Sequence, residues 1–315
     1  MIISYLIKYM KNDKIIRVIY PILIKQTKIS IEEQLKSYVY SQLTKLGKVK
    51  DVDFICSQNS IPINRLNYSL ISYPHSVTYR CTIAFQLASR SSYPAIILAE
   101  EIFEWIKQNC SCFSVEDRQG NIEYNSNIRY MSFTFKLIKP GWLEFILDDK
   151  CLFLWLRHQY ISRISTYCTI YSNKLCNSLQ IVQYAYARSC DLLDLAKEQG
   201  IITGSNINFL NHQKTFKNKD YIFSYDIELK QLLLNSYTER QLISQIFTVL
   251  DSQVNKSEKD NIKQTLILSY YLLEFERSCR IFPFKKSKSI EKSQARLGLI
   301  VITQGLLQKV CFNKP

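Results

Sequence analysis

The sequence contains little glycine, proline or histidine: seven Gly, seven Pro and three His in 315 residues. No two glycines form a Gly-x-Gly, whereas loops that cradle a phosphate need clustered glycines so that the backbone can approach the anion. A Rossmann fingerprint and a P-loop are therefore excluded. The histidines, His75, His158 and His212, are scattered along the chain, which disfavours His-based catalytic and metal sites. This composition is unfavourable for an enzyme.

Long apolar runs are also absent. Near the N-terminus every apolar run is broken, well short of the ~20 residues that a membrane span needs, by Lys8, Lys11, Lys14 and Arg17. We therefore expect no membrane partner, no export signal and a cytoplasmic location, where the ten Cys serve as small apolar fillers in a reducing compartment. Cys110 and Cys112 are the one close pair, without the second pair or nearby His that a zinc site needs, so we expect no metal and no cofactor.

Positive charge is abundant and unevenly placed. The chain has 41 Lys and Arg against 27 Asp and Glu, a net charge of +14. Residues 1–50 contain ten basic and three acidic side chains, and residues 281–315 contain seven and one. Basic patches attract polyanions, of which nucleic acids and membrane surfaces are the usual ones. The alternative is a basic surface that only confers solubility.

The first half of the chain mixes helical and strand patterns. Ser30 and Glu33 form a capping box that begins a helix, and Gly47 ends it. We predict a second helix over 78–90 and a third that Pro94 opens and that runs through Ile106. After Asn109 the apolar period changes to two, which predicts strands over 131–137 and 142–147 joined by a turn at Pro140-Gly141. This half is expected to be a small α+β domain.

From about residue 150 the pattern is helical to the end. We predict a long helix over 178–199 that Gly200 closes, followed by a polar loop over 206–220. Four further helices are predicted over 226–236, 238–253, 259–279 and 290–310. Short connections favour antiparallel neighbours, so this half is expected to be an all-α bundle.

Three segments of the second half resemble one family. Gln183-Tyr184-Ala185-Tyr186-Ala187-Arg188 resembles the Gln-Tyr-Ala-His-Ala-Arg motif of the DALR anticodon-binding domain of arginyl-tRNA synthetases. YYLLEFERSCRIFP (270–283) is similar to a later helix of that domain, and residues 295–307 are similar to its closing helix. In the first half, residues 78–106 and the Pro-Gly-Trp-Leu-Glu-Phe strand (140–145) resemble the N-terminal accessory domain of the same enzymes.

The resemblance implies a domain plan. Residues 1–27 are a basic N-terminal extension, either an added strand or a disordered arm; 28–148 is the accessory α+β domain. Residues 149–177 are a linker in place of the catalytic domain, and 178–315 is the DALR-type helical domain. The two His of the HIGH motif, which contact ATP phosphates in the family, have no counterpart. Residues 285–289 (KKSKS) are similar to the KMSKS motif. They lie inside the segment that resembles the anticodon-binding domain, so we interpret them as a solvated basic loop.

Candidate RNA-binding residues follow from this resemblance and from charge. Tyr184 and Arg188 are four residues apart and share a helix face, where a tyrosine can stack on a base and an arginine can pair with phosphate. The alternative is a core tyrosine and an arginine that forms an ion pair in helix packing. Gln183 and Tyr186 point elsewhere and are secondary candidates. Charge density suggests phosphate contacts at Lys285, Lys286, Lys288 and Lys292.

In the accessory domain, the family's aromatic residue and amide in the Pro-Gly strand hold an unpaired base at the tRNA elbow. Trp142 occupies the aromatic position and could stack on such a base; the alternative is a core residue of the hairpin. Glu144 replaces the amide, and an ionised carboxylate can only accept hydrogen bonds and repels phosphate. Recognition of the elbow in its usual form is therefore not expected.

The sequence thus predicts a non-catalytic relative of arginyl-tRNA synthetase that binds tRNA, or another structured RNA, through its helical domain. The alternative is an interaction module that docks a synthetase or another protein, on surfaces that the missing catalytic domain would have covered. A cryptic aminoacylating or acyl-transferring enzyme is a third interpretation.

Overall fold

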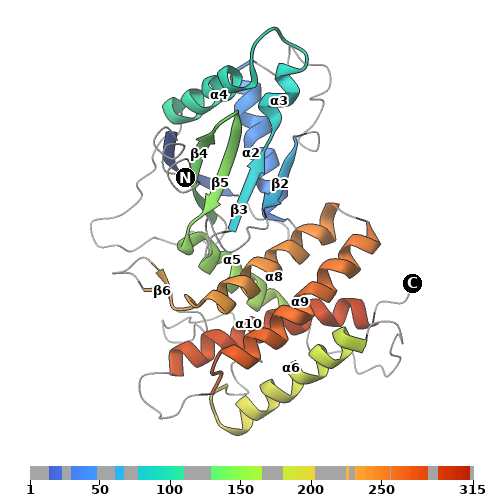
Figure 1. Cartoon of the computed structure of the whole chain (residues 1–315). Helices are drawn as coiled ribbons and strands as arrows, with labels where there is room; N and C mark the ends of the chain where they lie inside the picture. The colour runs from blue at the N-terminus through green and yellow to red at the C-terminus, as the bar shows by residue number, and fades with distance from the viewer. Residues whose placement is uncertain are drawn as a thin grey trace, which may run out of the picture. The chain divides into compact units, whose positions relative to one another are not determined.

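The computed structural model describes ten stretches of the chain: residues 14–22, 30–47, 61–66, 77–109, 129–164, 180–202, 225–226, 231–255, 257–282 and 290–312. The chain divides into two compact units (Figure 1). Unit 1 comprises Met1–Ser69 and Ser76–Cys151, and unit 2 comprises Leu70–His75 and Leu152–Pro315.

Unit 1 contains a five-stranded antiparallel sheet of order β1-β4-β5-β3-β2. Its strands are β1 (Lys14–Ile22), β2 (Ile63–Leu66), β3 (Val77–Cys81), β4 (Arg129–Ile138) and β5 (Trp142–Leu147). Of the two alternatives for the N-terminal extension, the added strand is correct for Lys14–Ile22, which pairs with β4 along its whole length.

Three helices accompany this sheet: α2 (Ile31–Lys45), α3 (Ile83–Ala88) and α4 (Ala95–Asn109). The predicted cap of α2 is confirmed, because the Ser30 hydroxyl accepts a hydrogen bond from the Glu33 amide at 3.1 Å. Aromatic side chains fill the space between helices and sheet. Tyr38 of α2 meets the ring of Phe133 edge-on, and Phe103 of α4 stacks on Phe135. Both helices therefore cover the same face of β4.

The helix predicted over 78–90 is wrong in its first part, and only Ile83–Ala88 within that range is helical. Val77–Cys81 is strand β3, which pairs with β2 on one side and with β5 on the other, and the helix that follows is α3, Ile83–Ala88. Partners on both sides satisfy the backbone groups of Val77–Cys81, and this pairing overrides the local helical pattern.

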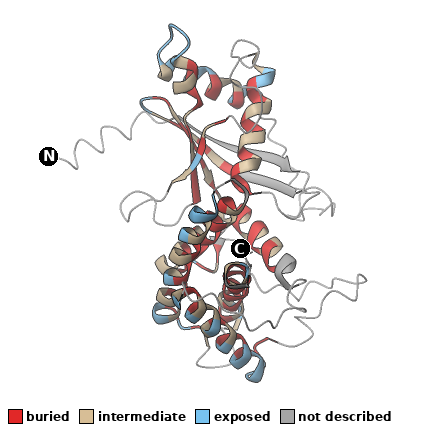
Figure 2. Ribbon diagram, turned by 90° about the vertical axis from the view of Figure 1, so that its right-hand side faces the viewer, coloured by how far each residue is buried: buried red, intermediate tan, exposed pale blue. Residues whose placement is uncertain are grey.

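Unit 2 is mainly helical. It contains α6 (Gln180–Glu198), α8 (Tyr237–Asn255), α9 (Glu258–Ser278) and α10 (Ile290–Phe312). Helix α5 (Asp149–Ile164) spans the division between the units, so the segment expected to be a linker begins with a helix, whose Leu152 and Leu156 are buried. Figure 2 shows buried residues along the inner sides of the helices of unit 2 and exposed residues on their outer sides.

The helix predicted over 226–236 is also wrong. Tyr225–Asp226 and Gln231–Leu232 are the short antiparallel strands β6 and β7, and α8 begins at Tyr237. Ser236 and Glu239 set this start: the Glu239 amide donates to the Ser236 hydroxyl at 3.3 Å, and the Ser236 amide donates to the Glu239 carboxylate at 2.7 Å. This capping box was not recognised in the sequence. The long helices α6, α8, α9 and α10 agree with the predicted ones within a few residues.

The chain is thus mainly helical with one small antiparallel sheet in unit 1. Among the described helices, none combines the length and the apolar character that crossing a bilayer requires.

Candidate nucleic-acid interface

Helix α6 presents Tyr184 to the surface. Val182, Ala185 and Ser189 are among the residues that α6 buries, and they recur at helical spacing, so the opposite side of the helix faces outwards. Tyr184 lies on that outer side and is 60% exposed. A core position, one of the two alternatives for this tyrosine, is therefore excluded.

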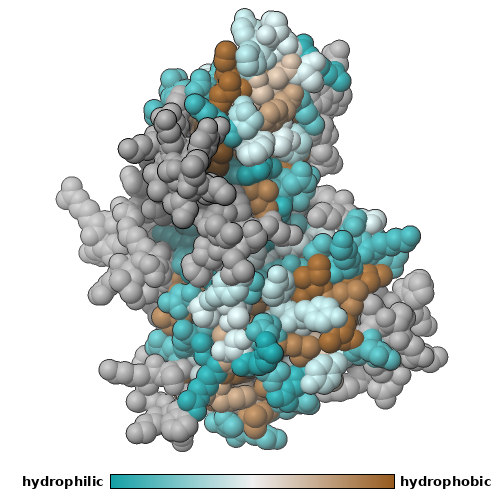
Figure 3. Space-filling view, in the orientation of Figure 1, coloured by the Kyte–Doolittle hydropathy of each residue, from teal (hydrophilic) through white to brown (hydrophobic). Residues whose placement is uncertain are grey.

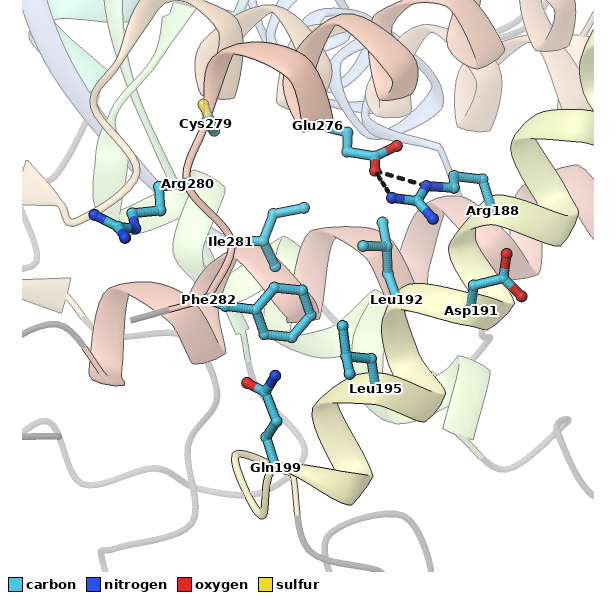
Figure 4. A pocket seen from close by; sticks show the side chains of 10 residues that line it. All are labelled: Arg188, Asp191, Leu192, Leu195, Gln199, Glu276, Cys279, Arg280, Ile281 and Phe282. Atoms are coloured by element: carbon cyan, nitrogen blue, oxygen red, sulfur yellow. Dashed lines mark hydrogen bonds and ion pairs between the residues drawn. The ribbon is translucent and has the colours of Figure 1, made fainter. Parts of the chain in front are cut away.

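Arg188, one turn further along α6, is held by α9. Its Nε donates to Glu276 Oε1 at 2.6 Å, and its Nη2 contacts the same oxygen (Figure 4). The hydrogen bond to Glu276 is the main cause of a raised pKa of the Arg188 guanidinium. The arginine side chain is 41% exposed and the glutamate 20%. Of the two alternatives for Arg188, the structure therefore shows the ion pair between packed helices. Part of the Arg188 side chain is still exposed to solvent.

A groove lies beside this ion pair, between the C-terminal half of α6 and the end of α9 with the residues that follow. It encloses about 580 Å³. In Figure 4 four apolar side chains converge on its middle, Arg188 and Glu276 lie at one end and Gln199 at the other; the apolar residues are Leu192, Leu195, Ile281 and Phe282. Asp191, Cys279 and Arg280 complete the lining. The groove therefore offers apolar contact area bordered by charges of both signs.

The two helices around the groove are not basic. Helix α6 carries two basic and three acidic side chains, and α9 carries three and four. Asp191 and Glu276, both of which line the groove, would repel a phosphate there. Acidic side chains outnumber basic ones on both helices, so α6 and α9 do not by themselves form a basic face.

Gln183 and Tyr186 lie on other sides of α6, and both are half-buried. Tyr186 is engaged within its own helix, since its carbonyl accepts from the Ser189 hydroxyl at 2.6 Å. Burial raises the pKa of the Cys190 thiol, and hydrogen bonds from Gln304 and Tyr186 act in the opposite direction. These contacts place Tyr186 towards the α6–α10 contact rather than beside Tyr184.

Lys292 of α10 is the one basic-loop candidate within the described residues; Lys285, Lys286 and Lys288 lie outside them. Its Nζ donates to Asn235 Oδ1 at 3.4 Å and lies 3.9 Å from Glu239 Oε1. The same buried carboxylate accepts from Arg296 Nε at 2.7 Å, and Arg296 also donates to the Arg280 carbonyl. Glu239 therefore joins the start of α8 to α10 and, through Arg296, to the groove.

In unit 1, Trp142 and Glu144 share one cation. Arg80 of β3 lies directly opposite Glu144 of β5 and donates to its Oε1 from Nε at 3.0 Å and from Nη2 at 2.5 Å. The Arg80 guanidinium carbon also sits 3.9 Å from the centre of the Trp142 ring. Glu144 is fully buried and Trp142 half-buried. Arg80 thus covers one face of the Trp142 ring and pairs with Glu144 Oε1.

The sequence did not single out three residues of unit 2 that lie at the surface of α9 or line the groove. Tyr270, Glu276 and Phe282 belong to the segment that carried the resemblance, but that resemblance did not indicate which side of the helix each would face. The signal that separates the sides is the spacing of the residues that α9 buries, among them Leu268, Leu272 and Phe275. Tyr270 falls between them and is exposed.

The comparisons with known proteins add no relative. No protein-family model, curated protein or solved structure matches the chain. Within the described residues, no three His, Cys, Asp or Glu side chains gather where they could hold a metal ion.

Proposed function

We propose that the chain is a non-catalytic RNA-binding protein related to arginyl-tRNA synthetase. Unit 2 is then a DALR-type domain that grips the anticodon arm of a tRNA, or a similar hairpin loop, on the outer face of α6. The motif Gln183–Arg188, the helices that carry the two other matching segments and the order of the two units support the proposal.

The exposed ring of Tyr184 is the observation that carries it. A tyrosine that is 60% exposed on a helix gains little from packing in the core, whereas it can stack on an unpaired base. Arg188 lies one turn away, and the groove begins beside it. Because Glu276 and Asp191 weaken the local positive charge, stacking supplies more of the affinity here than phosphate contacts do.

Cations for the phosphates come from the sequence that directly follows the groove. Phe282 lines the groove, and Lys285, Lys286 and Lys288 follow within six residues. Lys292 begins the next helix. Each phosphate neutralised by such a lysine releases counterions, which makes binding sensitive to salt.

Binding of full-length protein to total tRNA, measured by filter retention at ~50 and ~200 mM salt, tests this function. We expect measurable affinity at the lower salt and a fall of at least about tenfold at the higher one. No detectable affinity at low salt would remove the proposal. Absence of ATP–pyrophosphate exchange with arginine is expected as well, because the sequence has no counterpart of the HIGH motif.

Docking of a protein is the second candidate function, and the composition of the groove favours it. Four apolar side chains meet there, among them Leu195, which is 39% exposed. Apolar area bordered by charges of both signs is typical of protein interfaces. We expect RNase-treated arginyl-tRNA synthetase to be retained by immobilised protein, and Leu195→Glu to abolish retention, if docking is the function; loss of tRNA binding with Tyr184→Ser alone favours RNA.

A further inference from the structure

The groove beside Arg188 is bordered at two places where a helix ends. On one side Gln199 lines it just before Gly200 closes α6, and on the other Cys279–Phe282 line it where the chain leaves α9. The space-filling view shows apolar areas between hydrophilic ones over unit 2, the mixture that also lines this groove (Figure 3). Residues beyond a helix end lie outside its hydrogen-bond ladder, so other parts of the chain must hold both walls.

Arg296 of α10 holds the wall that follows α9. Its Nη1 donates to the Arg280 carbonyl, and its Nε donates to Oε1 of Glu239 at 2.7 Å. Glu239 is fully buried at the start of α8, where its other oxygen accepts from the Ser236 amide. The guanidinium therefore bridges a firmly anchored carboxylate and the backbone of the groove wall.

Cys279, the residue before Arg280, is held as well. Its thiol lies 3.0 Å from the Thr238 hydroxyl of α8, and its amide donates to the Phe275 carbonyl at 2.8 Å. Cys279 is only 5% exposed. Access of a reagent to this thiol therefore reports whether the wall stays in place.

Gln294, two residues before Arg296, contacts the opposite wall. Its Nε2 donates to the Ile201 carbonyl at 3.3 Å, and the Ile201 amide donates to the Ala196 carbonyl at 3.0 Å, at the end of α6. Residues two apart in a helix point to different sides. The second turn of α10 thus reaches both walls of the groove.

We propose that Arg296 and Gln294 are positioning residues of the groove, which fix its two walls so that a bound hairpin loop meets preformed side chains. This inference rests on the proposed RNA binding. Side chains that are already ordered in the free protein lose less freedom on binding, which raises affinity. Lysine cannot replace Arg296 in this role, because an ammonium lacks the planar fork that reaches a carboxylate and a carbonyl together.

Alkylation of Cys279 by iodoacetamide, followed by mass spectrometry on the native full-length chain, measures how firmly the wall is held without any RNA. We expect Arg296→Gln and Arg296→Lys to speed this labelling at least about threefold, because each loses the hydrogen bond to the Arg280 carbonyl. Lys36→Gln is the matched control. Lys36 pairs with the buried Glu32 of unit 1 at 2.7 Å, and its side chain is 13% exposed, as is that of Arg296.

Titration of total tRNA with the same proteins tests the consequence for binding. We expect at least about threefold weaker binding for Arg296→Lys and for Gln294→Ala, and unchanged binding for Lys36→Gln. Thermal melts set a temperature at which every variant is folded, so that a loss of affinity does not reflect unfolding.

The outcomes separate this inference from the proposed function. Unchanged labelling of Cys279 in both Arg296 variants overturns the positioning role. Faster labelling with unchanged tRNA affinity makes Arg296 purely structural and overturns it as well. A wild type without tRNA affinity overturns the proposed function, and with it the positioning of RNA, even where the labelling shows that Arg296 holds the wall.

Discussion

Arg188 of α6 donates from Nε to Oε1 of Glu276 in α9 at 2.6 Å. The two residues are 88 positions apart in sequence, so the contact joins α6 and α9, two helices whose sequences resemble the proposed family. The pair joins the two helices, and under the proposed function Glu276 also neutralises a cation one turn from Tyr184.

Glu276→Gln separates these two roles. Without the carboxylate the Arg188 charge is free to pair with phosphate, so tRNA affinity should rise about three- to tenfold. Stability should fall by less than about 1 kcal/mol, because the arginine side of the pair is well exposed. Paired tRNA titrations and urea melts of wild type, Glu276→Gln and Arg188→Ala measure both. Unchanged affinity in both variants would make the pair purely structural.

Burial of Glu144 beside Arg80 predicts strong coupling in unit 1. Glu144→Leu leaves the guanidinium without its carboxylate and should cost about 3 kcal/mol of unfolding free energy. Arg80→Met in the Glu144→Leu background removes the unpaired charge and should recover most of that loss. Urea unfolding followed by tryptophan fluorescence gives the double-mutant cycle, and additive losses would show that the two side chains do not interact.

Gly141 is required where the β4–β5 turn passes the start of α4. Its φ is +142°, and a Cβ there would come within 3.0 Å of the carbonyl carbon and oxygen of Ala95. Gly200, at the end of α6, has φ +66° but open space around it. Gly141→Ala should therefore lower unfolding free energy by about 1–3 kcal/mol more than Gly200→Ala. Equal losses in urea melts would mean that the close approach to Ala95 carries no cost.

Local signals predicted several helix starts but not the contacts between distant segments. Ser30 and Pro94 mark helix starts in the sequence and do so in the structure. Thr78–Cys81 was predicted as helix because the strand state of this segment depends on β2 and β5, which no local pattern reveals. Because this strand was not predicted, the pairing of Arg80 with Glu144, 64 residues away, could not be predicted either.

For the candidate site, too, the side of the helix could be predicted from the sequence, but the contacts of its residues could not. The spacing of Tyr184 and Arg188 placed both on one side of a helix, but whether each would be buried, paired or exposed depended on α9. Glu276 has no sequence feature that singles it out as the partner of Arg188. Charge totals were misleading here, since the excess of basic residues over the whole chain is absent from α6 and α9.

Equilibrium titration of tRNA with wild type, Tyr184→Ser and Tyr93→Ser tests the central claim most directly. The two tyrosines are equally exposed, and only Tyr184 lies on α6. Because stacking on one base contributes about 1–3 kcal/mol, Tyr184→Ser should weaken tRNA binding at least about fivefold, while Tyr93→Ser leaves it unchanged. Equal affinities for all three proteins would contradict RNA binding on the outer face of α6.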